Sequence, residues 1–110
     1  MPVEEVYRRP DDYELETLGH EIGDLAFWQA LLRRERPRRV LEIGSGCGRL
    51  TLPLARQGAA QGFSVTGLEM EPAMLARAQQ HASAESAATQ RALRLAQGDA
   101  RDLDGALRRL

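Results

Sequence analysis

The chain has 110 residues, 43% of them hydrophobic, and its 15 basic residues nearly balance its 16 acidic ones. This length fits one globular domain, and the formal net charge of -1 excludes a general polyanion binder, because nucleic-acid-binding proteins usually carry a basic excess. No apolar run approaches the ~20 residues of a membrane span, and the single cysteine, Cys47, excludes an internal disulfide and a cysteine-based zinc site. We therefore expect a cytoplasmic protein without nucleic-acid, membrane or metal-ion partners.

Residues 1–23 are predicted to form an N-terminal arm, because this segment is polar and has no clear hydrophobic period. Three of its side chains could line a substrate pocket, or the arm could be a loosely packed terminus; they are Tyr7, Tyr13 and His20. A helix is predicted next, with Asp24 as its N-cap, Pro37 as its end, and an apolar face of Leu25, Trp28, Leu31 and Leu32.

Short apolar segments alternate with helical patterns in the rest of the chain. The predicted strands are Arg39–Ile43, 63–68 and 92–96. One predicted helix covers 50–57, and a second starts at Pro72, ends in a loop over 83–89 and carries an apolar stripe of Met74, Leu75, Ala78 and Ala82. This alternation predicts an α/β domain over 24–110 with a doubly wound topology and a parallel sheet of order 3-2-1.

The first predicted strand runs straight into a glycine turn that contains Gly44, Gly46 and Gly48. Such a turn, followed by a helix N-terminus, lets the backbone approach a nucleotide-containing ligand, although it could also be a simple packing turn. The usual dinucleotide pattern needs its third glycine one residue later, where this chain has Arg49. Glu42 would disfavour a pyrophosphate and would suit a ligand with a positive amino group or sulfonium.

The next two predicted strands also end in acidic residues. Glu69 follows the second strand and could accept both hydroxyls of a ribose, or be an ordinary solvated carboxylate. Met70 next to it could cover one face of an adenine, although by itself it would more often be a core residue. Asp99 follows the third strand and could accept from an adenine amine or simply cap the following turn.

These motifs resemble those of the class I S-adenosylmethionine-dependent methyltransferases. The matching segments are Val-Leu-Glu-Ile-Gly-Ser-Gly-Cys-Gly at 40–48, Val-Thr-Gly-Leu-Glu-Met at 65–70 and Gln-Gly-Asp-Ala at 97–100. The resemblance implies a Rossmann-like three-layer sandwich that binds S-adenosylmethionine and transfers its methyl group to a small-molecule acceptor.

The resemblance also implies a role for each matching residue. The glycine turn, formed by Gly44, Ser45, Gly46 and Gly48, would hold the methionine part of the cofactor. Its amino group would lie near Glu42 and its carboxylate near Thr51. The ribose hydroxyls would bind Glu69, and the adenine would contact Met70, Asp99 and Ala100. No residue of this chain matches a catalytic position of the family.

The chain departs from the family because the strands expected after the third one are missing. We therefore expect it to be the cofactor-binding part of a methyltransferase, inactive by itself, with an exposed strand edge from Val40 to Ile43. A homodimer, the N-terminal arm or a C-terminal half could cover that edge. Two alternatives are a non-catalytic nucleoside-binding or dimerisation module and, among enzymes, a nicotinamide-dependent oxidoreductase, which Glu42 and Arg49 disfavour.

Overall fold

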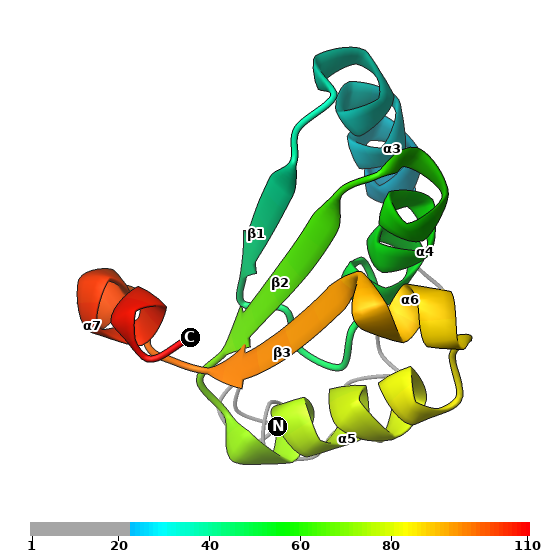
Figure 1. Ribbon diagram of the computed structural model, residues 1–110. Coiled ribbons are helices and arrows are strands. Elements are labelled where there is room, and N and C mark those ends of the chain that lie inside the picture. Colours follow the sequence, from blue (N-terminus) through cyan, green and yellow to red (C-terminus); the bar gives the residue numbers. More distant parts are fainter. Residues whose placement is uncertain (1–22) are drawn as a thin grey trace.

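The computed structural model describes residues 23–110, so the predicted arm with Tyr7, Tyr13 and His20 lies outside the described residues. Helices and strands alternate along the described part of the chain (Figure 1). In chain order they are α3 (Gly23–Glu35), β1 (Arg39–Ile43), α4 (Thr51–Gln61), β2 (Ser64–Glu69), α5 (Pro72–Ser83), α6 (Ala87–Arg91), β3 (Leu93–Gln97), the 3-10 turn η1 (Ala100–Asp102) and α7 (Leu103–Arg108).

The three strands form one parallel sheet in the order β1-β2-β3, which confirms the predicted fold class and strand order. Val40 of β1 pairs in register with Val65 of β2, and Val65 pairs with Leu93 of β3. β1 lies at an edge of the sheet described here, and Leu41 and Ile43 are 39% and 50% exposed. The predicted apolar strand edge is therefore present.

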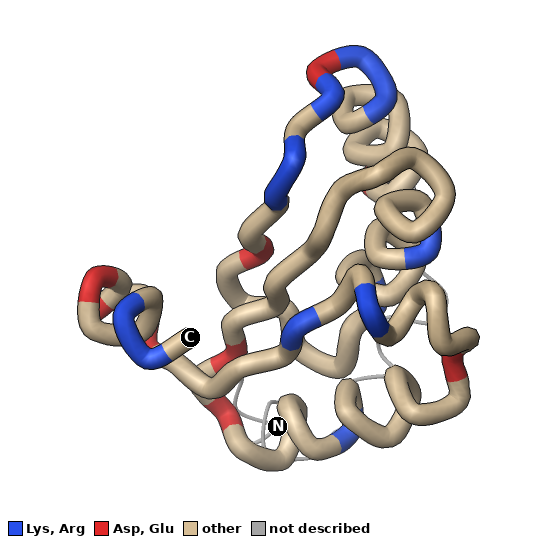
Figure 2. The backbone as a smooth tube through the Cα atoms, viewed as in Figure 1, with Lys and Arg blue, Asp and Glu red and all other residues tan. Residues whose placement is uncertain are grey.

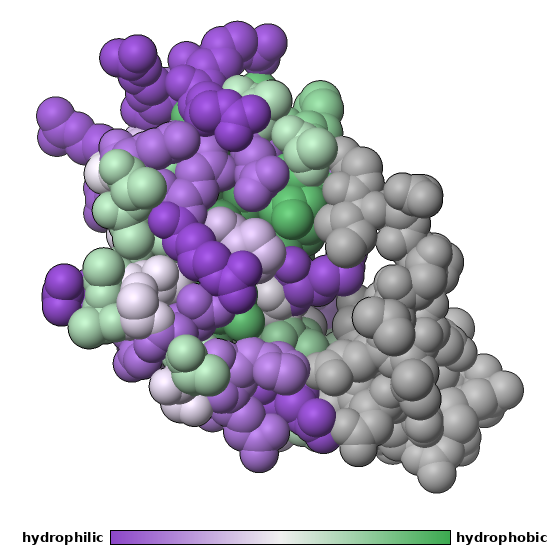
Figure 3. All heavy atoms as spheres, turned by 90° about the vertical axis from the view of Figure 1, so that its right-hand side faces the viewer, coloured by the Kyte–Doolittle hydropathy of each residue, from purple (hydrophilic) through white to green (hydrophobic). Residues whose placement is uncertain are grey.

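The helices divide unequally between the two faces of the sheet. α3, α4, α5 and α6 lie on one side and α7 alone lies on the other (Figure 1). The core forms on the four-helix side, where a buried cluster of α4 and β2 residues packs against partly buried side chains of α3, β1 and β3; the cluster consists of Leu54, Ala55, Phe63 and Val65. The outer surface of this side is mostly hydrophilic, with scattered hydrophobic patches (Figure 3).

Several element boundaries differ from the predicted ones. Asp24 is not an N-cap, because α3 already begins at Gly23. The predicted helix 50–57 extends to Gln61, where Gly62 ends it in a left-handed conformation. Phe63 belongs to this helix end, since its amide donates to the Gly58 carbonyl at 3.1 Å, and the second strand therefore starts one residue later than predicted.

The predicted loop over 83–89 contains the start of the short helix α6. Ser86 is its N-cap, and the Ser86 hydroxyl accepts a hydrogen bond from the Thr89 amide at 3.2 Å. β3 consequently begins at Leu93 instead of 92. Pro72 is the first residue of α5, as predicted, and Met74 and Ala78 of the predicted stripe are buried.

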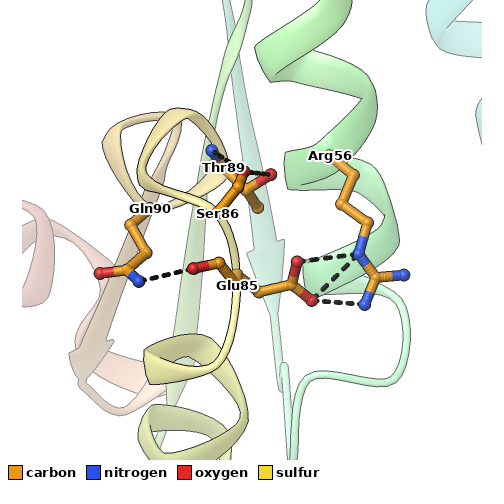
Figure 4. Close-up of polar contacts among 5 residues, drawn as sticks. All are labelled: Arg56, Glu85, Ser86, Thr89 and Gln90. Carbon is orange, nitrogen blue, oxygen red and sulfur yellow. Dashed lines mark hydrogen bonds and ion pairs between the residues drawn. The ribbon is translucent and has the colours of Figure 1, made fainter.

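An ion pair fastens the α5–α6 connection to α4. The guanidinium of Arg56 binds both carboxylate oxygens of Glu85, with Nε 3.0 Å from each oxygen and a further contact through Nη2 (Figure 4). Gln90 reaches back to the Glu85 carbonyl at 2.8 Å. The pairing with Arg56 lowers the pKa of Glu85. These contacts hold α6 and therefore the start of β3 against the helical layer.

Arg56→Ala is expected to lower the free energy of unfolding at neutral pH by about 0.5–1 kcal/mol, since the pair is bidentate but the arginine is largely exposed. Because the pKa of Glu85 is lowered, this contribution is present above the ordinary glutamate pKa and is lost as the pH falls through the lowered one. Urea unfolding at several pH values checks both statements. The control is Arg34→Ala, which removes an exposed pair between adjacent residues; equal losses in the two variants would contradict the prediction.

Candidate functional site

The glycine turn between β1 and α4 is fixed by hydrogen bonds to the neighbouring strand. Gly44, Gly46 and Gly48 have φ angles of 75°, 60° and 92°, a region in which side-chain-bearing residues are strained. The amides of Gly44 and Ser45 both donate to the Leu68 carbonyl, at 2.8 and 3.2 Å. Among residues 23–110, no heavy atom lies within 4 Å of the position that a Cβ on Gly44 would occupy, apart from its chain neighbours. The turn is therefore anchored to β2 and leaves open space at its first glycine.

Glu69 at the end of β2 joins this turn to the next one. Its Oε1 accepts a hydrogen bond from the Gly46 amide at 2.7 Å, and its Oε2 accepts one from the Glu71 amide at 2.9 Å. The glycine turn and the β2–α5 turn thus share a single carboxylate. The structure brings Glu69 into direct contact with the glycine motif, at the carboxyl end of the sheet where ligands of parallel-sheet proteins bind.

Glu42 and Thr51 form a second contact at the turn. The Thr51 hydroxyl donates to Glu42 Oε1, and Thr51 is fully buried. Burial raises the pKa of Glu42, while the hydrogen bond from Thr51 acts in the opposite direction. A cationic group bound beside this partly buried carboxylate would favour its charged form and lower its pKa again. The contact of Thr51 with a ligand carboxylate stays a prediction.

Gly67 in the middle of β2 makes room for the turn, a role that the sequence motifs did not reveal. A Cβ on Gly67 would lie 2.9 Å from Ser45 Cβ and Oγ and 3.0 Å from Thr51 Cγ2. Ser45 is buried against this glycine, and its hydroxyl has no hydrogen-bond partner in the described part of the chain. Only a residue without a side chain lets the turn pack this closely on the strand.

At the tip of β3, Asp99 bonds to the turn that follows the strand. Asp99 accepts from the Arg101 amide at 2.8 Å and also binds the Arg101 guanidinium, which lowers the pKa of Asp99 to about 2. Asp99 therefore caps the turn that begins at Ala100, which was one of the two roles predicted for it. Met70 is 55% exposed and is not a core residue. The sequence motifs did not identify Arg101 as the partner of Asp99.

Two further residues of the turn have structural partners. Arg49, which interrupts the dinucleotide pattern, forms a bidentate ion pair with Asp24 of α3 and lowers the pKa of that carboxyl. Cys47 is buried, and its Sγ lies 3.5 Å from the Met74 Sδ. Within 23–110 no three His, Cys, Asp or Glu residues are placed to hold a metal ion, and no helix in that range is long and apolar enough to cross a membrane.

Comparisons with known proteins agree with this geometry. A family model described as a methyltransferase domain matches residues 40–109. The glycopeptide N-methyltransferase MtfA complexed with sinefungin is 29% identical, with a TM-score of 0.59, and the match covers 68% of this chain and 29% of that one. Other structures of the same enzyme are complexed with S-adenosyl-L-methionine or S-adenosyl-L-homocysteine.

A second solved structure shows the fold alone, because its sequence identity is 20%. It is a putative S-adenosyl-L-methionine-dependent methyltransferase from Methanococcus maripaludis, with a TM-score of 0.65, and the match covers 84% of this chain and 42% of that one. The chain thus spans less than half the length of either solved structure. A search among curated proteins found no match.

Glu42→Gln is expected to gain stability relative to the wild type as the pH rises above the ordinary glutamate pKa near 4.5. Because folding raises this pKa, the folded wild type binds more protons than the unfolded chain. Its stability therefore falls as the pH rises from the ordinary pKa to the raised one. Glutamine does not titrate, so the variant does not lose stability in this way. Urea unfolding of both proteins from about pH 4 to pH 7 measures the difference.

The matched variant is Thr51→Val, which removes the hydrogen bond that favours the charged carboxylate. It should lose stability with rising pH more steeply than the wild type. A stability difference between Glu42→Gln and the wild type that does not change with pH would contradict the account of Glu42.

Proposed function

The chain belongs to the methyltransferase domain family, and we propose that it binds S-adenosylmethionine at the glycine turn for methyl transfer to a small-molecule acceptor. The observation that supports this most is the shared carboxylate of Glu69, which lies at a strand tip and contacts the glycine motif directly. The solved structures of MtfA with S-adenosylmethionine and S-adenosylhomocysteine support the same ligand class.

The residues at the three strand tips suit the groups of this cofactor. The open side of Gly44 leaves room for the methionine part, and Glu42 offers a carboxylate to its amino group. Each oxygen of Glu69 accepts one backbone hydrogen bond and has a further acceptor site for a ribose hydroxyl. The exposed side chain of Met70 is available to an adenine face, and Asp99 and Ala100 follow the neighbouring strand.

When bound, the cofactor supplies a methyl group on a cationic sulfur, which an acceptor nucleophile can attack directly. What this chain contributes is the position of the cofactor, since methyl transfer depends largely on the alignment of the two reactants. Arg101 competes with an adenine amine for Asp99, because its guanidinium already binds the Asp99 carboxylate.

The acceptor side of the reaction requires more than the residues described here. The chain spans less than half of the MtfA structure, and we propose that it is inactive alone until a C-terminal half or another chain covers the edge from Val40 to Ile43. The alternative is a non-catalytic nucleoside-binding or dimerisation module. We also propose a cytoplasmic location, because the one cysteine of the sequence, Cys47, leaves no internal disulfide to form.

Calorimetry with S-adenosylmethionine, S-adenosylhomocysteine and NADH tests the proposed ligand. We expect micromolar binding of the first two and none of NADH, and Glu69→Ala should weaken binding by about 10- to 100-fold because two hydrogen bonds to a charged group are lost. Glu71→Ala is the matched control, since it removes an adjacent carboxylate that makes no capping hydrogen bond.

Glu69→Gln separates folding from binding in this experiment. The amide oxygen can still accept from Gly46 and hold the turn, but the charge that strengthens the ribose contact is gone. Circular dichroism verifies that each variant is folded. Tight NADH binding, or equal loss in the Glu69 and Glu71 variants, would contradict the proposed site.

A further inference from the structure

Thr51 is the first residue of α4 and lies wholly inside the fold. Its methyl group packs on β2, since a Cβ on Gly67 would lie 3.0 Å from Thr51 Cγ2. Its hydroxyl donates to Glu42 Oε1 on β1. A hydroxyl has one proton to donate, so the Thr51 proton is already engaged before any ligand binds at the glycine turn.

The carboxylate of Glu42 depends on this one bond for its orientation. Glu42 is half-buried and lies opposite Gly67 in the β1–β2 ladder. In the described part of the chain, the Thr51 hydroxyl is the one hydrogen-bond donor to this carboxylate. The guanidinium of Arg49 favours the charged form of Glu42, but a bidentate pair holds it to Asp24. Fixing the carboxylate therefore falls to Thr51.

The surroundings of Glu42 oppose its negative charge. Acidic residues lie toward the carboxyl ends of β1 and β2, whereas basic residues lie toward the amino ends of β1 and β3 (Figure 2). Burial raises the pKa of Glu42, and the carboxylates of Asp24 and Glu69 add to this rise. The hydrogen bond from Thr51 is the largest effect that lowers the pKa. Without it, the carboxyl would hold its charge less well and would be free to rotate.

We propose that Thr51 is a positioning residue for the amino group of the bound cofactor and acts only through the carboxylate of Glu42. The inference rests on the proposed binding of S-adenosylmethionine at the glycine turn. The Thr51 hydroxyl engages Oε1 of Glu42, so Oε2 is left to accept from the ligand ammonium. This role differs from the direct contact with the ligand carboxylate that the resemblance implied for Thr51.

Calorimetry with three ligands tests this role: S-adenosylhomocysteine, its analogue without the amino group and its analogue without the carboxylate. Thr51→Val should weaken binding of the two ligands that keep the amino group by the same factor, about three- to tenfold, because the carboxylate that receives this group loses its hydrogen bond. Binding of the analogue without the amino group should not change. Thr51→Ser keeps the hydroxyl and should restore binding. In a Glu42→Gln background, Thr51→Val should cost no further affinity.

Thr89→Val is the matched control, because Thr89 is also a buried threonine with a hydrogen-bonded hydroxyl but lies in α6. This variant should bind all three ligands like the wild type. An NMR titration of the Glu42 carboxyl in the ligand-free chain gives a readout that does not need the cofactor. The pKa of Glu42 should be higher in Thr51→Val than in the wild type and unchanged in Thr89→Val.

Two patterns of ligand binding would overturn the inference. If Thr51→Val loses affinity for S-adenosylhomocysteine but not for the analogue without the carboxylate, Thr51 contacts the ligand carboxylate directly. If it loses affinity equally for all three ligands, the substitution merely loosens the turn. Wild-type binding that Thr51→Val leaves unchanged would overturn this inference alone, whereas a wild type that binds none of the ligands would contradict the proposed function as well.

Discussion

The carboxylate of Glu69 is the contact on which the arrangement at the strand tips depends. It accepts from Gly46 in one turn and from Glu71 in the next, so both turns are held to the end of β2 by one side chain. The amides of Gly44 and Ser45 add two hydrogen bonds to the Leu68 carbonyl. The glycine conformations and the missing side chain of Gly67 are what allow the turn to come this close to the strand. The glycines of the sequence therefore determine how closely the turn approaches β2, and with it the position of the site.

The same contact implies that a ligand shares Glu69 with the backbone. Each oxygen of Glu69 accepts one backbone hydrogen bond, and the Arg101 guanidinium binds Asp99. An ionised carboxylate offers about four acceptor sites, so ribose hydroxyls can bind Glu69 beside its backbone donors. Glu42 differs from these two carboxylates, because burial raises its pKa by disfavouring the charged form. A cationic ligand group beside it would favour that charged form.

The sequence predicted the features that depend on local spacing. The glycine turn, the strand order and Pro72 at the start of α5 follow from short-range rules, and all three are confirmed. Contacts between distant segments could not be read in this way: the pair of Arg56 and Glu85 and the packing of Gly67 exist only once the chain has folded.

The most direct test of the central claim is an NMR titration of the amides of Gly46 and Glu71 with S-adenosylhomocysteine. If the ribose binds Glu69, both amide resonances should move as the ligand saturates the protein, because the acceptor of each amide takes a further hydrogen bond, while that of Leu107 on α7 stays in place. If the ligand binds and the Gly46 and Glu71 resonances do not move, the ribose does not bind Glu69, and the account of the site is contradicted.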